Sequence, residues 1–236
     1  MDDEAAVFAE RLRSPEAQEA IAAGLVTVDG AVVAKAAARV DPGARLAAEP
    51  VYPWVSRGGV KLAAALDAFG IRSDGRIALD AGASTGGFTD VLLARGAAHV
   101  YAVDVGRDQL HPRLRADPRI VDWSGTDARS LHPGLFPEPP SLVVCDASFI
   151  SLTLLLPALL PLAGRPADFV GLVKPQFEAG RAHVRKGVVR DRAAQEAACT
   201  RVRDAITTHG WRVAGLIPSP ILGQDGNAEF LIWAQA

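Results

Sequence analysis

The sequence predicts an α/β protein, with a large domain built on a mostly parallel sheet and a small N-terminal α+β unit before it. Three observations predict this fold class. From Gly59 onward, short apolar runs typical of buried strands alternate with segments of helical periodicity. A glycine-rich turn separates the first of these strands from the next helix, as in sheets that bind nucleotides. Residues 1–49 follow a different pattern, with a helix, a hairpin and tight turns.

The N-terminal unit begins with a predicted helix. Apolar residues recur at helical spacing over residues 7–23, interrupted by a Ser-Pro pair suited to an N-cap and a first helical position, and Gly24 ends the pattern. Two short apolar runs within residues 25–33 flank an Asp-Gly turn and predict a hairpin. Residues 50–56 contain two prolines and predict an extended linker. The predicted domains are therefore residues 1–49 and 57–236.

The large domain contains the alternating elements. We expect helices over residues 60–69, 88–95, 149–162 and 191–209, the first of them closed by Gly70. We expect strands over residues 77–80, 100–105, 142–145, 169–173, 213–217 and 230–233. This order is typical of a Rossmann-like sheet with helices on its faces.

The composition is that of an ordinary globular protein. Of the 236 residues, 49% are hydrophobic and 22% are charged, which excludes disorder over most of the chain. The 25 basic and 27 acidic residues nearly balance, so any binding to nucleic acid must use a local patch. Cys145 and Cys199 are the only cysteines, which excludes a disulfide framework and a four-cysteine zinc site, and we predict no metal. Oligomeric state has no signal in the sequence.

The sequence also predicts a cytoplasmic protein that does not enter membranes. Residues 1–4 are acidic and no apolar run follows them, unlike a signal peptide. The richest apolar stretch, residues 152–163, is too short to cross a bilayer and contains two prolines and a threonine.

The strongest chemical signal is the glycine-rich turn after the first strand of the large domain. Glycines let the backbone approach a ligand closely, and the helix that follows offers free N–H groups. Asp104 ends the next strand, where an acid can accept both hydroxyls of a ribose. The candidate ligand-binding residues of the turn are Asp80, Gly82, Ala83, Ser84, Thr85, Gly86, Gly87 and Phe88.

Two ligands compete for this turn. The order G-A-S-T-G-G breaks the dinucleotide fingerprint, whereas an acid before the first glycine favours S-adenosylmethionine (SAM), because it would lie near the cationic methionyl end. A tight turn without a ligand is the third possibility. Asp127 follows a third strand, at a position suited to the adenine amino group or to a solvated loop.

Six sequence blocks extend this interpretation over most of the chain. They are WVSRGGVKL (54–62), LDAGASTGGFTD (79–90), CDASFISL (145–152), VKPQFEAG (173–180), GVVRD (187–191) and PSPILGQDGNAEFLIW (218–233). In this order they resemble the TlyA/hemolysin A family of rRNA ribose 2′-O-methyltransferases. The resemblance implies an S4-type RNA-binding domain, a short linker and a class I methyltransferase domain that uses SAM. It also implies a ribosomal substrate, met as free 16S or 23S rRNA or within ribosomal subunits, and methylation of a cytidine 2′-hydroxyl.

The resemblance implies a catalytic Lys-Asp-Lys-Glu set, which maps to Lys61, Asp146, Lys174 and Glu229. The chemistry is reasonable in itself, since a ribose hydroxyl is a poor nucleophile that must be aimed at the methyl carbon, and an ammonium can stabilise the developing oxyanion. We expect Lys174 to lie nearest the 2′-oxygen, with Asp146 orienting it close to the methyl donor. The alternatives are an ordinary surface role for either lysine and a structural loop role for Asp146. Glu229 stands beside an apolar strand, where it would be costly without a partner.

A basic stretch over residues 180–192 is the first candidate for contact with RNA phosphates, and a solvated loop is its alternative. Its candidate residues are Arg181, Arg185, Lys186 and Arg190, and Arg57 is a further one.

The N-terminal unit keeps other functions open. Residues 1–30 contain seven acidic and two basic residues, although an RNA-binding helix is usually basic. A related methyltransferase that acts on another RNA or on a small molecule is therefore an alternative. A cytolysin and a non-catalytic RNA-binding module are two more, although the helix at 191–209 mixes both charges, which is unlike a membrane-binding helix.

Overall fold

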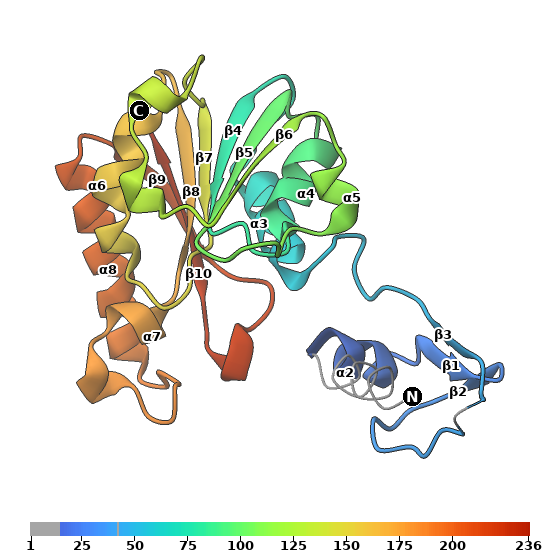
Figure 1. Cartoon of the computed structure of the whole chain (residues 1–236). Coiled ribbons are helices and arrows are strands. Elements are labelled where there is room, and N and C mark those ends of the chain that lie inside the picture. Colours follow the sequence, from blue (N-terminus) through green and yellow to red (C-terminus); the bar gives the residue numbers. More distant parts are fainter. Residues whose placement is uncertain (1–14, 42) are drawn as a thin grey trace. The chain divides into compact units, whose positions relative to one another are not determined.

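The computed structural model describes residues 15–41 and 43–236, which form two compact units divided between Pro53 and Trp54 (Figure 1). Each unit has its own sheet. The start of the predicted N-terminal helix, before Pro15, lies outside the described residues, as does Pro42.

The first unit is a small α+β arrangement. Its elements are α2 (Pro15–Ala22), β1 (Val26–Val28), β2 (Ala31–Val32) and β3 (Leu46–Ala48), and the strands form an antiparallel sheet in the order β2-β1-β3. The predicted hairpin is confirmed: Asp29 and Gly30 have φ values of 50° and 82°, as a two-residue turn of positive φ requires. Strand β3 was not predicted, because its Leu-Ala-Ala sequence is exposed and lacks β-branched residues.

The second unit has a seven-stranded sheet with helices on both faces (Figure 1). Its strands are β4 (Ile77–Ala81), β5 (His99–Asp104), β6 (Ile120–Ser124), β7 (Leu142–Cys145), β8 (Asp168–Val173), β9 (Arg212–Pro218) and β10 (Phe230–Gln235). Its α-helices are α3 (Arg57–Phe69), α4 (Gly87–Ala94), α5 (Pro112–Arg115), α6 (Leu156–Leu159), α7 (Pro175–Glu178) and α8 (Arg192–Thr208). Short 3₁₀ helices are η1 (Ala128–Ser130), η2 (Pro133–Leu135), η3 (Leu152–Leu154), η4 (Leu160–Leu162), η5 (Arg181–His183) and η6 (Gln224–Gly226).

The sheet order is β6-β5-β4-β7-β8-β10-β9. The strands β6, β5, β4, β7 and β8 are parallel to one another. The next strand, β10, is antiparallel to both β8 and β9. The prediction of a mostly parallel sheet is confirmed.

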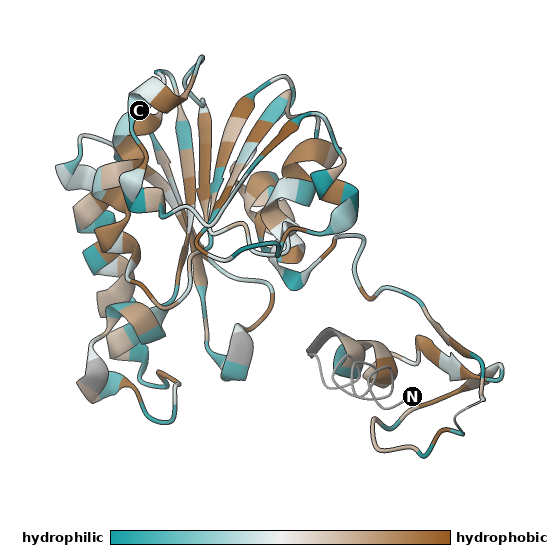
Figure 2. Cartoon of the chain, viewed as in Figure 1, coloured by the Kyte–Doolittle hydropathy of each residue, from teal (hydrophilic) through white to brown (hydrophobic). Residues whose placement is uncertain are grey.

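Alternate residues of each central strand enter different hydrophobic cores. In β7, Leu142 and Val144 pack with residues of α3 and α4, whereas Val143 and Cys145 pack with residues of α6 and α8. All four are completely buried. Figure 2 shows the resulting pattern, with apolar strands between helices whose outer surfaces are more polar. The two covered faces explain why these strands are continuous apolar runs in the sequence.

One predicted helix is wrong in its extent. Residues 149–162 form η3, α6 and η4 in succession rather than a single helix. Pro157 and Pro161 lack the N–H that a continuous helix would need, so the segment breaks into short turns. The other predicted helices and strands of the large domain are present, with ends within three residues of those expected.

This topology brings five chain segments to one edge of the sheet. Parallel strands β4, β5, β7 and β8 all have their carboxyl ends there, and antiparallel β10 begins there, with Phe230 opposite Val173. Residues just after β7 and β8 and just before β10 therefore meet at the carboxyl edge.

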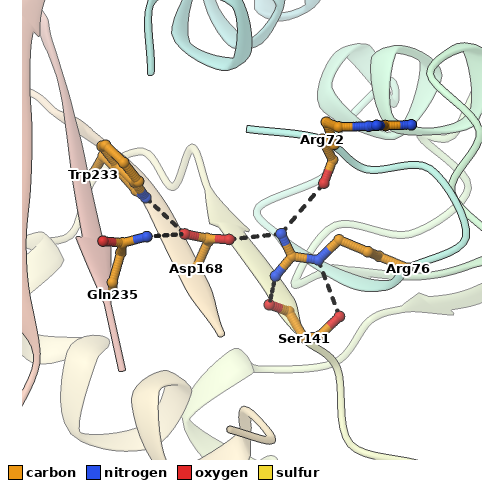
Figure 3. A network of polar contacts seen from close by, with 6 residues as sticks. All are labelled: Arg72, Arg76, Ser141, Asp168, Trp233 and Gln235. Carbon is orange, nitrogen blue, oxygen red and sulfur yellow. Dashed lines mark hydrogen bonds and ion pairs between the residues drawn. The ribbon is translucent and has the colours of Figure 1, made fainter. Parts of the chain in front are cut away.

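The opposite edge of the sheet is held by a polar network centred on Asp168 (Figure 3). Its carboxylate accepts hydrogen bonds from Arg76 Nη1 at 2.6 Å, Trp233 Nε1 at 2.8 Å and Gln235 Nε2 at 3.3 Å. Arg76 also donates to Ser141 Oγ and to the Ser141 carbonyl. Segments beside β4 and β7 and the strands β8 and β10 are thus tied together through one ion pair whose side chains are mostly buried.

Asp168→Ala is expected to lower the free energy of unfolding by about 2–4 kcal/mol, because the Arg76 guanidinium and the Trp233 indole lose their common acceptor. Urea unfolding followed by circular dichroism measures the change. Asp67→Ala is the matched control, since Asp67 pairs with Arg95 at the surface and its loss should cost less than about 1 kcal/mol. Equal losses in the two variants would contradict a special role for the network.

Candidate active site

The carboxyl edge holds an ion pair between residues that follow two neighbouring strands. Lys174 Nζ lies 2.6 Å from Asp146 Oδ1 and donates a hydrogen bond to Ser148 Oγ at 2.8 Å. The Lys174 side chain is only 9% exposed. Pro175, which begins α7, ends strand pairing at this point and sets the direction of the chain after Lys174. The alternative of an ordinary surface role for Lys174 is thus excluded, because its ammonium points at a carboxylate rather than into solvent.

A second ion pair joins α3 to the start of β10. Lys61 Nζ donates a hydrogen bond to Glu229 Oε2 at 2.6 Å, and the two side chains are 10% and 3% exposed. Gly223 lies so close that a Cβ there would come within 2.1 Å of Glu229 Oε1. Each buried charge has a partner, as burial requires.

The two ion pairs belong to one region. Gly58, at the start of α3, lies beside Asp146, since a Cβ there would come within 3.8 Å of Asp146 Oδ2. Register places Phe230, the residue after Glu229, opposite Val173, the residue before Lys174. All four residues of the predicted Lys-Asp-Lys-Glu set therefore lie at the carboxyl edge as two neutralised pairs.

A cavity of about 630 Å³ adjoins Asp146, within the size range of small-molecule sites. Of the predicted cofactor-binding residues, its lining includes Gly82, Ser84, Asp104, Asp127 and Asp146. The other predicted cofactor-binding residues do not line the cavity. They are Asp80, Ala83, Thr85, Gly86, Gly87 and Phe88.

The glycines of the turn allow close packing of the backbone. Gly82 has a φ of 85°, and a Cβ there would lie 2.9 Å from the backbone of Ala147. A Cβ on Gly87 would lie 2.2 Å from Ser56 Oγ and 2.9 Å from the amide nitrogen of Gly59. The turn is therefore pressed against the segment after β7 on one side and the start of α3 on the other.

Two acids of the cavity have defined partners. The Asp104 carboxylate accepts hydrogen bonds from the amides of Ser84 at 2.8 Å and Gly106 at 2.7 Å, which fixes it at the end of β5. Asp127 accepts hydrogen bonds from the Arg129 side chain and amide, and these contacts lower the pKa of Asp127. Both side chains are held in place before any ligand arrives.

Asp80 lies beneath the turn and is completely buried. Its Oδ2 accepts a hydrogen bond from Thr89 Oγ1 at 2.7 Å, and its Oδ1 has no hydrogen-bond partner among the residues that the structure describes. Burial raises the pKa of Asp80 to about 7, with the charges of Asp146 and Asp104 adding to the effect and Thr89 opposing it.

Sequence reasoning missed three residues of this region: Ser148, Phe149 and Glu178. Phe149 is 91% exposed, has a φ of 65°, lines the cavity and contacts Phe177 with ring centroids 5.6 Å apart. Glu178 is buried and binds the segment that carries Phe149. The only signal was their place inside two of the quoted sequence blocks, since exposure and φ depend on the folded loop.

The predicted RNA contacts fall on two surfaces. Arg57 Nη2 donates a hydrogen bond to the carbonyl of Leu222 at 2.7 Å, so this arginine also holds the loop before β10. Arg185, Lys186 and Arg190 are exposed, and the first two belong to a tight turn closed by pairing between Arg185 and Val188. The side chain of Arg181 lies outside what the structure describes.

The part of the chain that the structure describes contains neither a candidate metal site nor a membrane-spanning helix. Within residues 15–41 and 43–236, no group of three or more histidine, cysteine, aspartate or glutamate side chains could hold a metal ion. In the same part of the chain, no helix has the length and apolar character needed to cross a membrane.

The chain is similar to known proteins over both units. Residues 54–236 match the FtsJ-like methyltransferase family, and residues 12–46 match the S4 domain family. The 16S/23S rRNA (cytidine-2'-O)-methyltransferase TlyA of Mycobacterium tuberculosis is 48% identical over 221 residues, which cover 92% of this chain and 82% of that protein. Hemolysin A of Brachyspira hyodysenteriae is 40% identical, with 92% of this chain and 91% of that protein covered.

A solved structure from Streptococcus thermophilus, which carries a hemolysin name, has a TM-score of 0.81 and 42% sequence identity, covering 93% of this chain and 81% of that one. The α/β fold class with a methyltransferase sheet and an N-terminal S4 domain is confirmed. The chain belongs to the FtsJ-like methyltransferase family, and within it to the TlyA/hemolysin A group.

Proposed function

We propose that the chain transfers a methyl group from SAM to the ribose 2′-hydroxyl of a cytidine in ribosomal RNA. The observation that carries this proposal is the Lys174–Asp146 pair, whose Asp146 lines the same cavity as Gly82 and Ser84 of the glycine-rich turn. The similarity to an rRNA cytidine 2′-O-methyltransferase supports the same reaction, as does the S4 family match for the RNA substrate.

The cavity suits SAM in size and in charge. In this proposal Asp104 binds the ribose hydroxyls, Asp127 lies toward the adenine, and the backbone at Gly82 and Ser84 approaches the methionyl part. Three acids and one basic residue, Arg129, line the cavity, and this balance favours a ligand with a positive charge. SAM supplies the methyl group on an electrophilic sulfonium.

The residues of the two ion pairs act on the nucleophile. Lys174 is nearest the 2′-oxygen, where its ammonium stabilises the negative charge that the oxygen gains as the hydroxyl releases its proton to water. The oxygen then bonds to the methyl carbon while the carbon–sulfur bond breaks, and the sulfur leaves as a neutral thioether. Asp146 and Ser148 fix the direction of the Lys174 side chain, since both lie within 2.8 Å of Nζ. Lys61 and Glu229 keep the neighbouring wall of the site neutral overall and rigid.

Phe149 provides a surface for the target base. A ring that is 91% exposed beside the cavity has no packing role of its own, and bases unstacked from RNA are commonly bound on aromatic side chains. The contact with Phe177 holds the ring on one side and leaves the other available.

The remaining surfaces bind RNA in a less specific way. Exposed Arg185, Lys186 and Arg190 contact phosphates, together with Arg57 and Arg181. Residues 1–49 form the RNA-binding domain, residues 50–56 are the linker, and residues 57–236 form the methyltransferase domain. The substrate is presented within a ribosomal subunit or as free rRNA.

Lys174→Ala is expected to lower kcat by about 10²- to 10³-fold, because the developing oxyanion loses its cation. The experiment incubates the protein with tritiated SAM and ribosomal subunits from an unmethylated strain, and maps the label by nuclease digestion. Arg72→Ala is the control, because this arginine is 85% exposed and makes only a surface ion pair. Absence of label in rRNA with the unsubstituted protein would overturn the proposed function.

Phe149→Ala is expected to lower kcat/KM for rRNA by about 10- to 100-fold, because one base–aromatic stack is lost. The KM for SAM should change little. Phe149→Tyr keeps the ring and should retain most of the activity. A similar loss in both variants would contradict stacking as the role of this side chain.

Asp80→Asn is expected to flatten the pH dependence of stability. The folded pKa of Asp80, about 7, lies above the usual value of 3.8, so the native state holds a proton that the unfolded state has lost. Stability of the unsubstituted protein should therefore fall relative to the variant by about 1.4 kcal/mol per pH unit between pH 5 and pH 7, and then level off. Urea unfolding across this range in the absence of SAM measures the difference. Parallel curves would show that Asp80 ionises normally.

A further inference from the structure

The loop between β7 and η3 carries several parts of the proposed site. Within residues 146–151 are Asp146 and Ser148, which contact Lys174, and Phe149, which lines the cavity. A loop that positions these side chains must be fixed at both ends, because a displacement of about 1 Å at a reacting group can lower the rate by about 10²-fold.

The near end of the loop is held by the sheet and the glycine-rich turn. The Asp146 amide donates a hydrogen bond to the Ala81 carbonyl at 3.1 Å, which extends the pairing of β7 with β4 by one residue. The backbone of Ala147 packs against Gly82. The part of the loop that faces the cofactor cavity is thus fixed by backbone contacts.

At the far end, where Leu152 packs in the core, the loop receives two hydrogen-bond contacts from one side chain, Glu178. Its Oε2 accepts a hydrogen bond from Ser151 Oγ and its Oε1 accepts one from the Leu152 amide, both at 2.6 Å. Both oxygens of one carboxylate are therefore used on the two residues that end the loop and begin η3. Hydrogen bonds to a carboxylate are short and about twice as strong as neutral ones.

Glu178 also lies on the segment that carries Lys174. It is the last residue of α7, which begins immediately after Lys174 and also contains Phe177, the ring that contacts Phe149. The residue is 7% exposed and does not line the cavity. It can therefore act on the reacting atoms only through the two segments that it joins, the loop and α7.

We propose that Glu178 is a positioning residue for methyl transfer, which sets Ser148 and Phe149 in register with Lys174 by anchoring the end of the loop to α7. This inference rests on the proposed function. It adds a residue whose effect is on the geometry of the nucleophile and not on binding of the cofactor.

Glu178→Ala is expected to lower kcat for rRNA methylation by about 10- to 100-fold, since the loop end is released. The KM for SAM should stay within about threefold, because the cofactor side is held by the backbone contacts of Asp146 and Ala147 rather than by Glu178. Glu178→Gln should recover most of the rate, because its amide oxygen can accept from the Leu152 amide and its amino group can donate to Ser151 Oγ. Glu196→Ala, at an acid that is 69% exposed on α8, is the matched control and should behave as the unsubstituted protein.

Hydrogen exchange gives a readout that is independent of activity. Amides of residues 148–153 should exchange faster in Glu178→Ala than in Glu178→Gln, while those of β7 remain unchanged. If Glu178→Ala does not fold, Ser151→Ala replaces it, since that variant removes one of the two hydrogen bonds and should show a smaller loss of kcat in the same direction.

The outcomes separate this inference from the proposed function. Wild-type kcat in Glu178→Ala, or an equal loss in Glu178→Ala and Glu178→Gln, would overturn the positioning role and leave the methyltransferase assignment intact. A rise in the KM for SAM without a change in kcat would also overturn it. Absence of rRNA methylation by the unsubstituted protein would overturn both.

Discussion

The constraint on which the site depends is that charges withdrawn from water must be paired. Lys61, Lys174 and Glu229 are all buried, and Asp146 completes the set at the same edge of the sheet. An isolated charge in such a place would be far too costly, so each lysine must have its carboxylate within contact distance. The antiparallel insertion of β10 beside β8 meets this requirement, because it brings Glu229 to the edge where the parallel strands end. The order and direction of the strands therefore determine which charged residues can pair in the site.

The two edges of the sheet differ in how their polar groups are used. At the amino edge, Asp168 uses both carboxylate oxygens on Arg76, Trp233 and Gln235 and leaves no group to act on a ligand. At the carboxyl edge, the polar groups line a cavity or lie beside it, and Asp80 keeps one oxygen without a partner among the described residues. The strands β8 and β10 thus carry the fully hydrogen-bonded Asp168 network at one end. At the other end they lie next to Lys174 and Glu229, which are proposed to act in catalysis.

The fold could be predicted from the sequence because its strands are continuous apolar runs and its turns carry strong local signals, such as the Asp29-Gly30 hairpin. Strand β3 could not be predicted, because Leu46–Ala48 is too short to show an alternation and contains no β-branched residue. The segment at 149–162 reads as one helix from its apolar content, yet its prolines break it. The charged residues of the site could be named through the resemblance, and Asp146 was expected to orient Lys174. The direct pairing of Lys61 with Glu229 required the structure. The sequence could not predict Ser148, Phe149 or Glu178 as site residues, because their contacts depend on the path of the loop between β7 and η3.

The acidic character of the cavity has a consequence for turnover. Of the three acids that line the cavity, Asp127 pairs with Arg129 and Asp146 pairs with Lys174. Asp104 is held by amides alone among the described residues, so its charge makes the cavity favour a cation over a neutral molecule of the same shape. Methyl transfer converts the sulfonium into a neutral thioether, so the reaction itself removes the charge that the lining favours. Because Asp104 and Asp127 are held by amides and by Arg129 rather than by the ligand, the lining does not relax to fit the product. In the proposed reaction, the cavity would therefore bind the charged methyl donor in preference to its neutral product, and the fixed positions of Asp104 and Asp127 would promote release of that product.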